Sequence, residues 1–278
     1  MGLILAEQPE KYSWNAEDYA KHSATQFEWA KELVPKLQLS GNEALLDVGC
    51  GDGKISAQID TCLPRGCVVG VDNSEEMIRL ARSKFPQAKY PNVSFQVMDA
   101  RKLSFHERFD RVFSNAALHW IIDHRPVLEG VRRSLKSGGR LLFQMGGKGN
   151  AQRILALLDE LMVEDRWSRF FEGFTFPYGF HAPEEYAVWL REAGLNPERV
   201  ELLQKDMKLL GKDPLAGWVR TTWLPYTERL PVNMREEFVG EIVSRYVKAH
   251  PLDGSGYVHV AMVRLEVEAT RPLRDERA

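Results

Sequence analysis

Length, composition and charge restrict the classes of protein that this chain can belong to. Its 278 residues allow one sizeable domain with an insertion or a small second lobe. The 37 basic and 39 acidic side chains give a formal net charge of −2, which argues against a broad nucleic-acid-binding surface. The three cysteines form no even disulfide framework, and no apolar run is long enough to cross a bilayer. We therefore expect a cytoplasmic protein with no nucleic-acid or membrane partner.

The first predicted elements lead into a glycine-rich turn. Residues 10–37 are predicted to be a polar lead-in followed by a helix, because apolar side chains recur there at roughly helical spacing. The segment LLDVGCGDGK, residues 45–54, then has the pattern of a buried strand, a tight turn and the start of a helix. Gly49, Gly51 and Gly53 allow positive φ and a close approach to a ligand. This turn, with Asp47 at the end of the strand, predicts a site for a nucleotide-like cofactor.

The spacing of this turn excludes two common phosphate-binding motifs. A dinucleotide fingerprint requires a small residue where Lys54 stands. A P-loop requires glycine at the position of Val48 and Ser or Thr at the position of Ile55. The cofactor is therefore expected to be neither a dinucleotide nor a nucleoside triphosphate.

Three more strands are predicted, and each ends in polar residues. CVVGVD, residues 67–72, ends in Asp72, where a carboxylate can accept both ribose hydroxyls. Residues 73–76 then begin a helix with a cap and two acids in its first turn. The segment of residues 93–100 is predicted to hold a third strand ending in Asp99, and the segment of residues 109–120 a fourth strand ending near Ser114 and Asn115. Either acid alone could instead be a helix cap or a turn former.

The pattern changes after residue 150, and we predict a mixture of covering helices, lid segments and late strands. Residues 151–163 and 182–193 have helical spacing, and residues 167–181, rich in aromatic side chains and glycine, are expected to form a lid. Residues 197–210 and 256–269 are predicted to be strands, separated by an insertion that holds a long amphipathic helix at 234–250. Alternating strands and helices predict an α/β fold with a parallel sheet covered on both faces.

The order of these motifs resembles that of the class I S-adenosylmethionine-dependent methyltransferases. The resemblance covers residues 44–145 through DVGCGDG, VVGVDNSEEMI, the Asp99-Ala100 pair, FSNAALHW and LKSGGRLLFQM. It implies a doubly wound, mostly parallel, seven-stranded sheet with helical cap insertions, and S-adenosylmethionine as cofactor. Asp47, Gly49 and Gly51 would then hold the methionine part, Asp72 the ribose and Asp99 the adenine amine. The other expected cofactor-binding residues are Asn73, Met77, Ala100 and Asn115.

The resemblance also gives an expected domain organisation. We expect a single methyltransferase domain over residues 1–278, with a helical lead-in at 1–40 and a cofactor-binding core at 41–148. Cap insertions are expected at 149–181 and 211–254, and the last strand at 255–270.

Further segments resemble the trans-aconitate methyltransferase group and relatives that esterify small carboxylic acids. These segments are WNAEDY near the amino terminus, SNAALHW with Asp123-His124, the FQM strand and WVRTTWLPY. A carboxylate with a pKa of about 4 is already deprotonated at neutral pH, so such an acceptor needs no general base. We therefore expect a small-molecule acceptor, methylated on a carboxylate.

The acceptor site is predicted from a few side chains. His119 and Trp120 are expected to line it, and Arg220 is a candidate clamp for a carboxylate. Arg220 could equally be a surface arginine whose stem covers apolar neighbours. Weaker candidates are Tyr19, Gln26 and Gln144, and the other possible bases are His22, His124 and His181. No group of His, Cys and carboxylates has metal-ligand spacing, so no metal is expected.

Two other classes of function remain open from the sequence. A methyltransferase with a nitrogen, carbon or protein acceptor would share every cofactor residue. A noncatalytic cofactor-binding module would share them too, although it would have no need for an aromatic lid.

Overall fold

The computed structural model describes residues 24–274, which form two compact units. The core unit consists of residues 24–148, 179–204 and 263–274. The second unit contains residues 149–178 and 205–262. The predictions for WNAEDY, Tyr19 and His22 lie outside the described residues.

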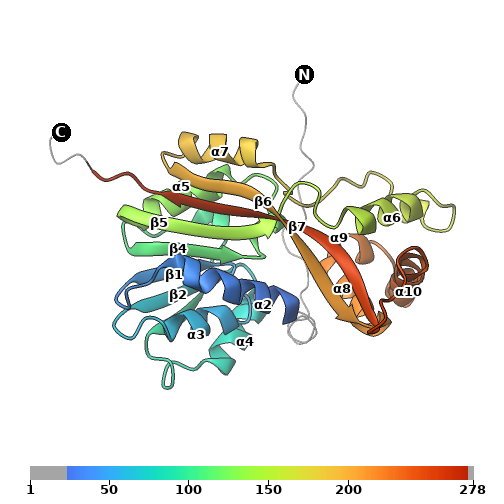
Figure 1. Ribbon diagram of the computed structural model, residues 1–278, viewed down its shortest axis with the longest axis horizontal. Coiled ribbons are helices and arrows are strands. Elements are labelled where there is room, and N and C mark those ends of the chain that lie inside the picture. The colour runs from blue at the N-terminus through green and yellow to red at the C-terminus, as the bar shows by residue number, and fades with distance from the viewer. Residues whose placement is uncertain (1–23, 275–278) are drawn as a thin grey trace. The chain divides into compact units, whose positions relative to one another are not determined.

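A seven-stranded sheet carries the fold, with strand order β3-β2-β1-β4-β5-β7-β6 (Figure 1). The neighbours from β3 to β5 pair in parallel, whereas β7 runs antiparallel to β5. This arrangement confirms the predicted doubly wound, mostly parallel sheet. The strands are β1 (Ala44–Val48), β2 (Cys67–Asp72), β3 (Val93–Val97), β4 (Phe109–Asn115), β5 (Leu135–Gly146), β6 (Asn196–Leu210) and β7 (Tyr257–Thr270).

Helices cover both faces of the sheet in the core unit. On one face, apolar side chains of α5 and α7 pack against β1, β4, β5 and β7 around Val112 and Phe143. On the other face, α2, η1 and α3 bury Phe113 and Leu142. Each such fully buried side chain stabilises the fold by about 1.5–3 kcal/mol. The helical elements of this unit are α2 (Ala24–Leu33), η1 (Val34–Leu37), α3 (Lys54–Asp60), α4 (Glu75–Lys84), η2 (Ala100–Lys102), η3 (Leu118–Trp120), α5 (Arg125–Ser134) and α7 (Pro183–Glu192).

One of these strands, β3, ends earlier than the sequence predicts, whereas β4 ends where it is predicted to end. β3 ends at Val97, because the Asp99 side chain accepts the backbone N–H of Arg101 and begins the short turn η2. β4 ends at Asn115, because Ala116 adopts a φ of 54° and η3 follows. A capping acid and a residue with left-handed backbone thus end strand pairing at the carboxyl edge of the sheet. The polar side chains lie at this edge.

The second unit is largely helical and has its own aromatic core. It contains α6 (Gln152–Met162), η4 (Ser168–Phe170), α8 (Lys212–Thr222), α9 (Leu224–Thr227) and α10 (Val232–Ala249). Trp167 from the predicted lid is fully buried and packs edge-on against Phe238 of α10, and its indole N–H donates to Glu241. The aromatic pattern of this segment therefore provides packing within the unit. Its role as a lid stays a prediction.

No helix among residues 24–274 is both long and apolar enough to cross a membrane.

In the second unit, the imidazole of one histidine lies between two carboxylates. His259 of β7 has Nδ1 2.7 Å from Asp206 Oδ2 and Nε2 2.9 Å from Asp253 Oδ2. Both carboxylates only accept hydrogen bonds, so this geometry suits the imidazolium. Hydrogen bonds from Asp253 and Asp206 accordingly raise the pKa of His259.

This clamp predicts a pH-dependent contribution to stability. A histidine whose pKa is raised by folding stabilises the protein fully below its unfolded pKa, and this contribution is lost as pH rises through the folded pKa. We expect the melting temperature of the wild type to exceed that of His259→Gln at about pH 6, and this excess to shrink towards about pH 9. The control is His106→Gln at an exposed position. A constant difference across this range would contradict the imidazolium clamp.

Candidate active site

The three glycines of the turn after β1 have different surroundings: two are closely packed against other side chains, and one is not. Gly49, Gly51 and Gly53 have φ values of 75°, 53° and 80°. A Cβ at Gly49 would lie 2.1 Å from the Ala117 Cβ, and one at Gly53 would lie 2.6 Å from the Phe95 ring. A Cβ at Gly51 would meet no atom of residues 24–274 within 4 Å, apart from its chain neighbours. The first and third glycines are therefore required by the protein itself, whereas the second leaves an open backbone that a ligand can approach.

Asp72, the last residue of β2, is hydrogen-bonded to this turn. Its Oδ2 accepts the Gly51 N–H at 3.0 Å, and its Oδ1 accepts the Ser74 N–H at 2.9 Å. Ser74, not Asp72, caps α4, since its side chain accepts the Met77 N–H. Burial raises the pKa of Asp72, and hydrogen bonds from the backbone of Ser74, Gly51 and Asn73 partly offset this rise. An ionised carboxylate has about four acceptor positions, so that of Asp72 can still accept a hydrogen bond from a ligand hydroxyl.

Asp47 is buried beneath the turn, at the end of β1. Its Oδ2 accepts a hydrogen bond of 2.6 Å from the Ser56 hydroxyl of α3. Burial raises the pKa of Asp47 to about 7, the Ser56 hydrogen bond lowers it, and the charge of Asp72 adds to the rise. Ser56 was not predicted from the sequence, where a serine in a helical first turn has no special signal.

The raised pKa of Asp47 predicts that its ionisation destabilises the ligand-free protein. The folded state holds the proton up to about pH 7 while the unfolded carboxyl loses it near 3.8, so stability falls as pH rises between these values. Each unit of difference corresponds to about 1.4 kcal/mol. We expect Asp47→Asn to melt at increasingly higher temperature than the wild type as pH is raised from about 5 to about 8.

Thermal unfolding of the ligand-free variants measures this effect. Asp123→Asn is the control, because a hydrogen bond from Arg125 holds the pKa of Asp123 below its usual range and the group does not titrate in this interval. Parallel melting curves for the wild type and Asp47→Asn across this pH range would refute the assignment.

The remaining predicted cofactor residues lie along the same edge of the sheet. Asn73 is exposed directly after β2, and Met77 is buried in the first turn of α4. Ala100 is half-buried in η2. The carboxylate of Asp99 binds the Arg101 guanidinium, with Oδ2 2.6 Å from Nη2. Its contact with an adenine amine stays a prediction, and such a contact would share the carboxylate with Arg101.

The segment after β4 holds the predicted acceptor-site aromatics. His119 is buried in η3, and Trp120 beside it is half-buried with its ring centroid 5.9 Å away. Burial lowers the pKa of His119 well below its usual value, and the charge of Arg264 adds to this effect. A histidine with so low a pKa is a weak base, so the structure favours a lining role for His119 over proton abstraction.

His124 and His181 pack against each other beside η3 in the core unit. His124 lies with Nε2 2.8 Å from the Leu118 carbonyl and Nδ1 3.2 Å from the Tyr186 hydroxyl. Burial lowers the pKa of His124 to about 4. His181 packs edge-on against His124, and its Nδ1 lies 3.1 Å from Glu185. These contacts hold the η3 segment in place.

Arg220 lies on α8 in the second unit. Its guanidinium forms a two-point ion pair with Glu236 of α10, with Nε 2.7 Å from Oε1 and Nη2 3.0 Å from Oε2. Its role as an acceptor clamp stays a prediction, and Glu236 would have to share the guanidinium with a substrate.

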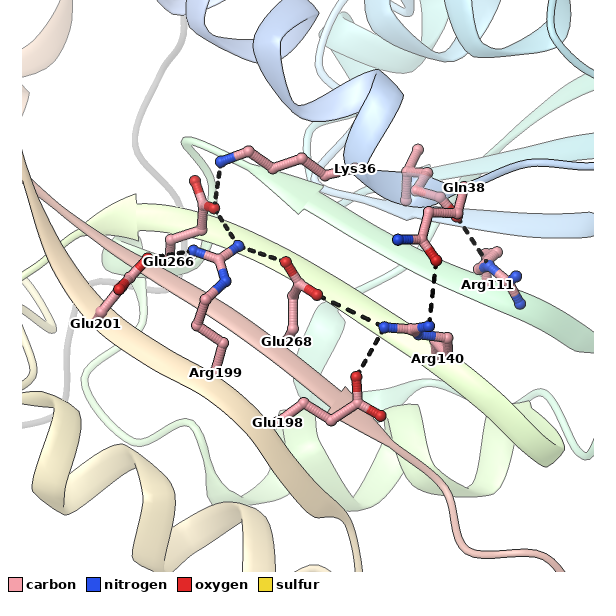
Figure 2. Close-up of polar contacts among 10 residues, drawn as sticks. Lys36, Gln38, Arg111, Arg140, Glu198, Arg199, Glu201, Glu266 and Glu268 are labelled. Atoms are coloured by element: carbon pink, nitrogen blue, oxygen red, sulfur yellow. Dashed lines mark hydrogen bonds and ion pairs between the residues drawn. The ribbon is translucent and has the colours of Figure 1, made fainter.

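A buried acid that the sequence did not single out lies within β7, opposite Gln144 near the carboxyl end of β5. Glu266 is completely buried, and it binds Lys36, Arg199 and the amide of Gln144. Figure 2 shows a chain of ion pairs that runs from Lys36 through Glu266, Arg199 and Glu268 to Arg140. Its sequence context, VRLEVEA, predicts a solvent-facing acid in an alternating strand, so no local signal indicates its burial.

The carboxyl edge of the sheet fits S-adenosylmethionine. The open backbone of Gly51 can approach the amino-acid part, and Asp72 can still accept a hydrogen bond from a ribose hydroxyl. No group of three or more metal-ligating His, Cys, Asp or Glu side chains occurs within residues 24–274.

Comparisons with known proteins identify the family of the chain. A family model described as "Methyltransferase domain" matches residues 39–175. An uncharacterised methyltransferase of Schizosaccharomyces pombe is 34% identical over 217 residues, which cover 77% of this chain and 81% of that protein. A trans-aconitate 2-methyltransferase of Azoarcus sp. is 33% identical over 263 residues, covering 93% of this chain and 99% of that protein.

The solved structures support the fold. The crystal structure of a methyltransferase-like protein from Bacillus halodurans superposes with a TM-score of 0.60 at 18% identity, covering 87% of this chain and 98% of that chain. A phosphoethanolamine N-methyltransferase of Haemonchus contortus, in complex with S-adenosylhomocysteine, gives a TM-score of 0.59 at 18% identity, covering 92% of this chain and 57% of that chain. On the sequence relatives and this fold together, the chain belongs to the class I S-adenosylmethionine-dependent methyltransferases.

Proposed function

We propose that this methyltransferase acts on a small molecule and transfers the methyl group to a carboxylate oxygen. The observation that carries the proposal is that neither of the two side chains predicted to line the acceptor, His119 and Trp120, is a competent base. His119 is buried with a strongly lowered pKa, and Trp120 cannot accept a proton. A carboxylate acceptor requires no base, because it is ionised at neutral pH. The Azoarcus relative named trans-aconitate 2-methyltransferase supports the same acceptor class.

The task of the protein in this reaction is positioning. When bound, S-adenosylmethionine supplies an electrophilic methyl group on a sulfonium. Gly51 and Asp72 are proposed to hold the donor, and His119 and Trp120 to line the acceptor side and exclude water. Such positioning removes most of the entropic cost of bringing two reactants together. No side chain has to take up a proton.

The test uses methyl-labelled S-adenosylmethionine with panels of small carboxylic acids and amines. A carboxyl methyl ester releases labelled methanol in mild base, whereas a methylated nitrogen or carbon keeps its label. We expect formation of S-adenosylhomocysteine with acids, together with base-labile product. Base-stable label, or turnover only with amines or proteins, would overturn the carboxylate and leave the cofactor assignment intact.

A variant of Arg220 tests its proposed contact with the acceptor. Arg220→Lys keeps the charge and loses the planar fork, so kcat/KM for an acid acceptor should fall by about tenfold or more. Affinity for S-adenosylhomocysteine should not change. Glu236→Gln is the matched control, because it removes the ion pair and keeps the arginine. Equal activity of Arg220→Lys and the wild type would remove Arg220 from the acceptor site.

A further inference from the structure

A polar row crosses one face of the sheet, just beyond the apolar core of that face. The register pairs Asn115 of β4 with Gln144 of β5, and Gln144 with Glu266 of β7. Neighbours paired in this way point to the same face. The preceding row on this face holds Phe113 and Leu142, which belong to the core under α2 and η1. This face of the sheet therefore changes from apolar to polar between one row of side chains and the next.

This row continues to the cofactor turn. Asp47 pairs with Phe113, so Gly49, two residues after Asp47, occupies the same level as Asn115, two residues after Phe113. Gln144 consequently lies on the face and at the level of the glycine turn, two strands away from it. Parallel strands of this kind bind ligands at their carboxyl ends.

Glu266 fixes the orientation of the Gln144 amide. Its Oε2 lies 2.8 Å from Gln144 Nε2, and a carboxylate accepts but never donates, so the nitrogen of the amide must face it. Lys36 and Arg199 hold Glu266 in turn (Figure 2). Burial would raise the pKa of Glu266, but hydrogen bonds from these cations and Gln144 outweigh burial and lower it. The acid thus stays ionised and keeps the amide from flipping.

The oxygen of the amide has no partner among residues 24–274. Gln144 is 1% exposed, and its Oε1 is buried without a hydrogen bond to any of these residues. Almost all buried side-chain oxygens in native proteins accept at least one hydrogen bond, so this atom requires explanation. Because the amide nitrogen points at Glu266 of β7, the amide oxygen faces away from β7. There it can accept a hydrogen bond from an N–H or O–H group.

We propose that Gln144 is a ligand-positioning residue of the methyl-transfer site, whose amide oxygen, oriented by Glu266, accepts a hydrogen bond from an N–H or O–H group of a bound ligand. Two ligands offer this chemistry: the methyl donor through its α-ammonium, and the acceptor through a hydroxyl or amine beside its reacting group. Water exclusion at this buried oxygen strengthens either bond. Only the acceptor alternative rests on the proposed function.

Two probes distinguish these sources by calorimetry without any methyl transfer. S-Adenosylhomocysteine carries the α-ammonium, whereas 5′-methylthioadenosine has the nucleoside and thioether without the amino-acid group. Gln144→Met keeps the length of the side chain and removes its oxygen. If the ammonium is the partner, affinity for S-adenosylhomocysteine should fall about 10- to 100-fold while affinity for methylthioadenosine stays constant.

If the acceptor is the partner, both affinities should stay constant. KM should then rise in Gln144→Met for acceptors that carry an O–H or N–H group, and not for matched acceptors that lack it. Either pattern supports the proposal. Loss of affinity for both probes would show a general structural role, and no change in binding or kinetics would show no ligand contact; each of these results overturns it.

Variants of the two acids test the positioning step. Glu266→Gln removes the fixed orientation, so it should reproduce the Gln144→Met pattern, and the double variant should be no worse than either single one. Glu268→Gln is the control, because Glu268 also binds Arg199 but makes no contact with Gln144. If Glu266→Gln fails to fold, Gln144→Met alone decides, with its melting temperature confirming the fold.

Discussion

Replacing Asp72 with alanine is expected to weaken S-adenosylmethionine binding by about 1.5–3 kcal/mol, the usual range for hydrogen bonds to a charged group. The substitution removes the carboxylate, which accepts the Gly51 and Ser74 hydrogen bonds and would also accept from the ribose. The same variant also releases the turn, because Gly51 loses its acceptor. Asp72→Asn separates these effects, since its amide oxygen can still accept one backbone N–H.

Calorimetry with S-adenosylhomocysteine on the folded variants measures this loss. Asp123→Ala is a matched control, because Asp123 is an exposed acid that follows η3 and pairs with Arg125. An unchanged affinity in Asp72→Ala would show that the ribose lies elsewhere, and the cofactor site would have to be rebuilt from another strand end.

The strands and the cofactor edge could be predicted because their signals are local. The strand, glycine turn and helix around Gly49 lie within about ten residues of sequence, and so do β2 and the cap at Ser74. A local signal also explains the early end of β3. Asp99 caps η2 and shortens β3, which the sequence allowed as an alternative to ligand binding.

The polar row could not be predicted, because its contacts join distant segments. Lys36 and Glu266 are 230 positions apart, and Gln144 and Glu266 are 122 apart. An alternating strand indicates which residues share a face, but it does not tell which face water reaches. Glu266 is buried only because cations from η1 and β6 meet it. The positive charge and the aromatic neighbours of Arg220 could be read from the sequence. Its ion pair with Glu236 is visible only in the structure.

Alanine at Gly49 is expected to have the largest effect on the protein, and alanine at Gly51 a selective effect on its ligand. Both positions have positive φ, which costs an L-residue about 1–2 kcal/mol. At Gly49 the new Cβ would also overlap Ala117, so the total loss of stability should be on the order of 2–5 kcal/mol. Gly51→Ala meets no protein atom and should lose only the conformational part.

The ligand distinguishes these two glycines further. If Gly51 is the place where the backbone approaches the cofactor, its Cβ intrudes on the ligand and should weaken S-adenosylhomocysteine binding by about 1–3 kcal/mol in a well-folded protein. Chemical denaturation measures the stability of both variants, and calorimetry measures binding to Gly51→Ala. Wild-type affinity in Gly51→Ala would place the cofactor away from this turn. Equal loss of stability in the two variants would instead mean that Gly51 is as closely packed as Gly49, because only contact with protein atoms can add to the shared backbone cost.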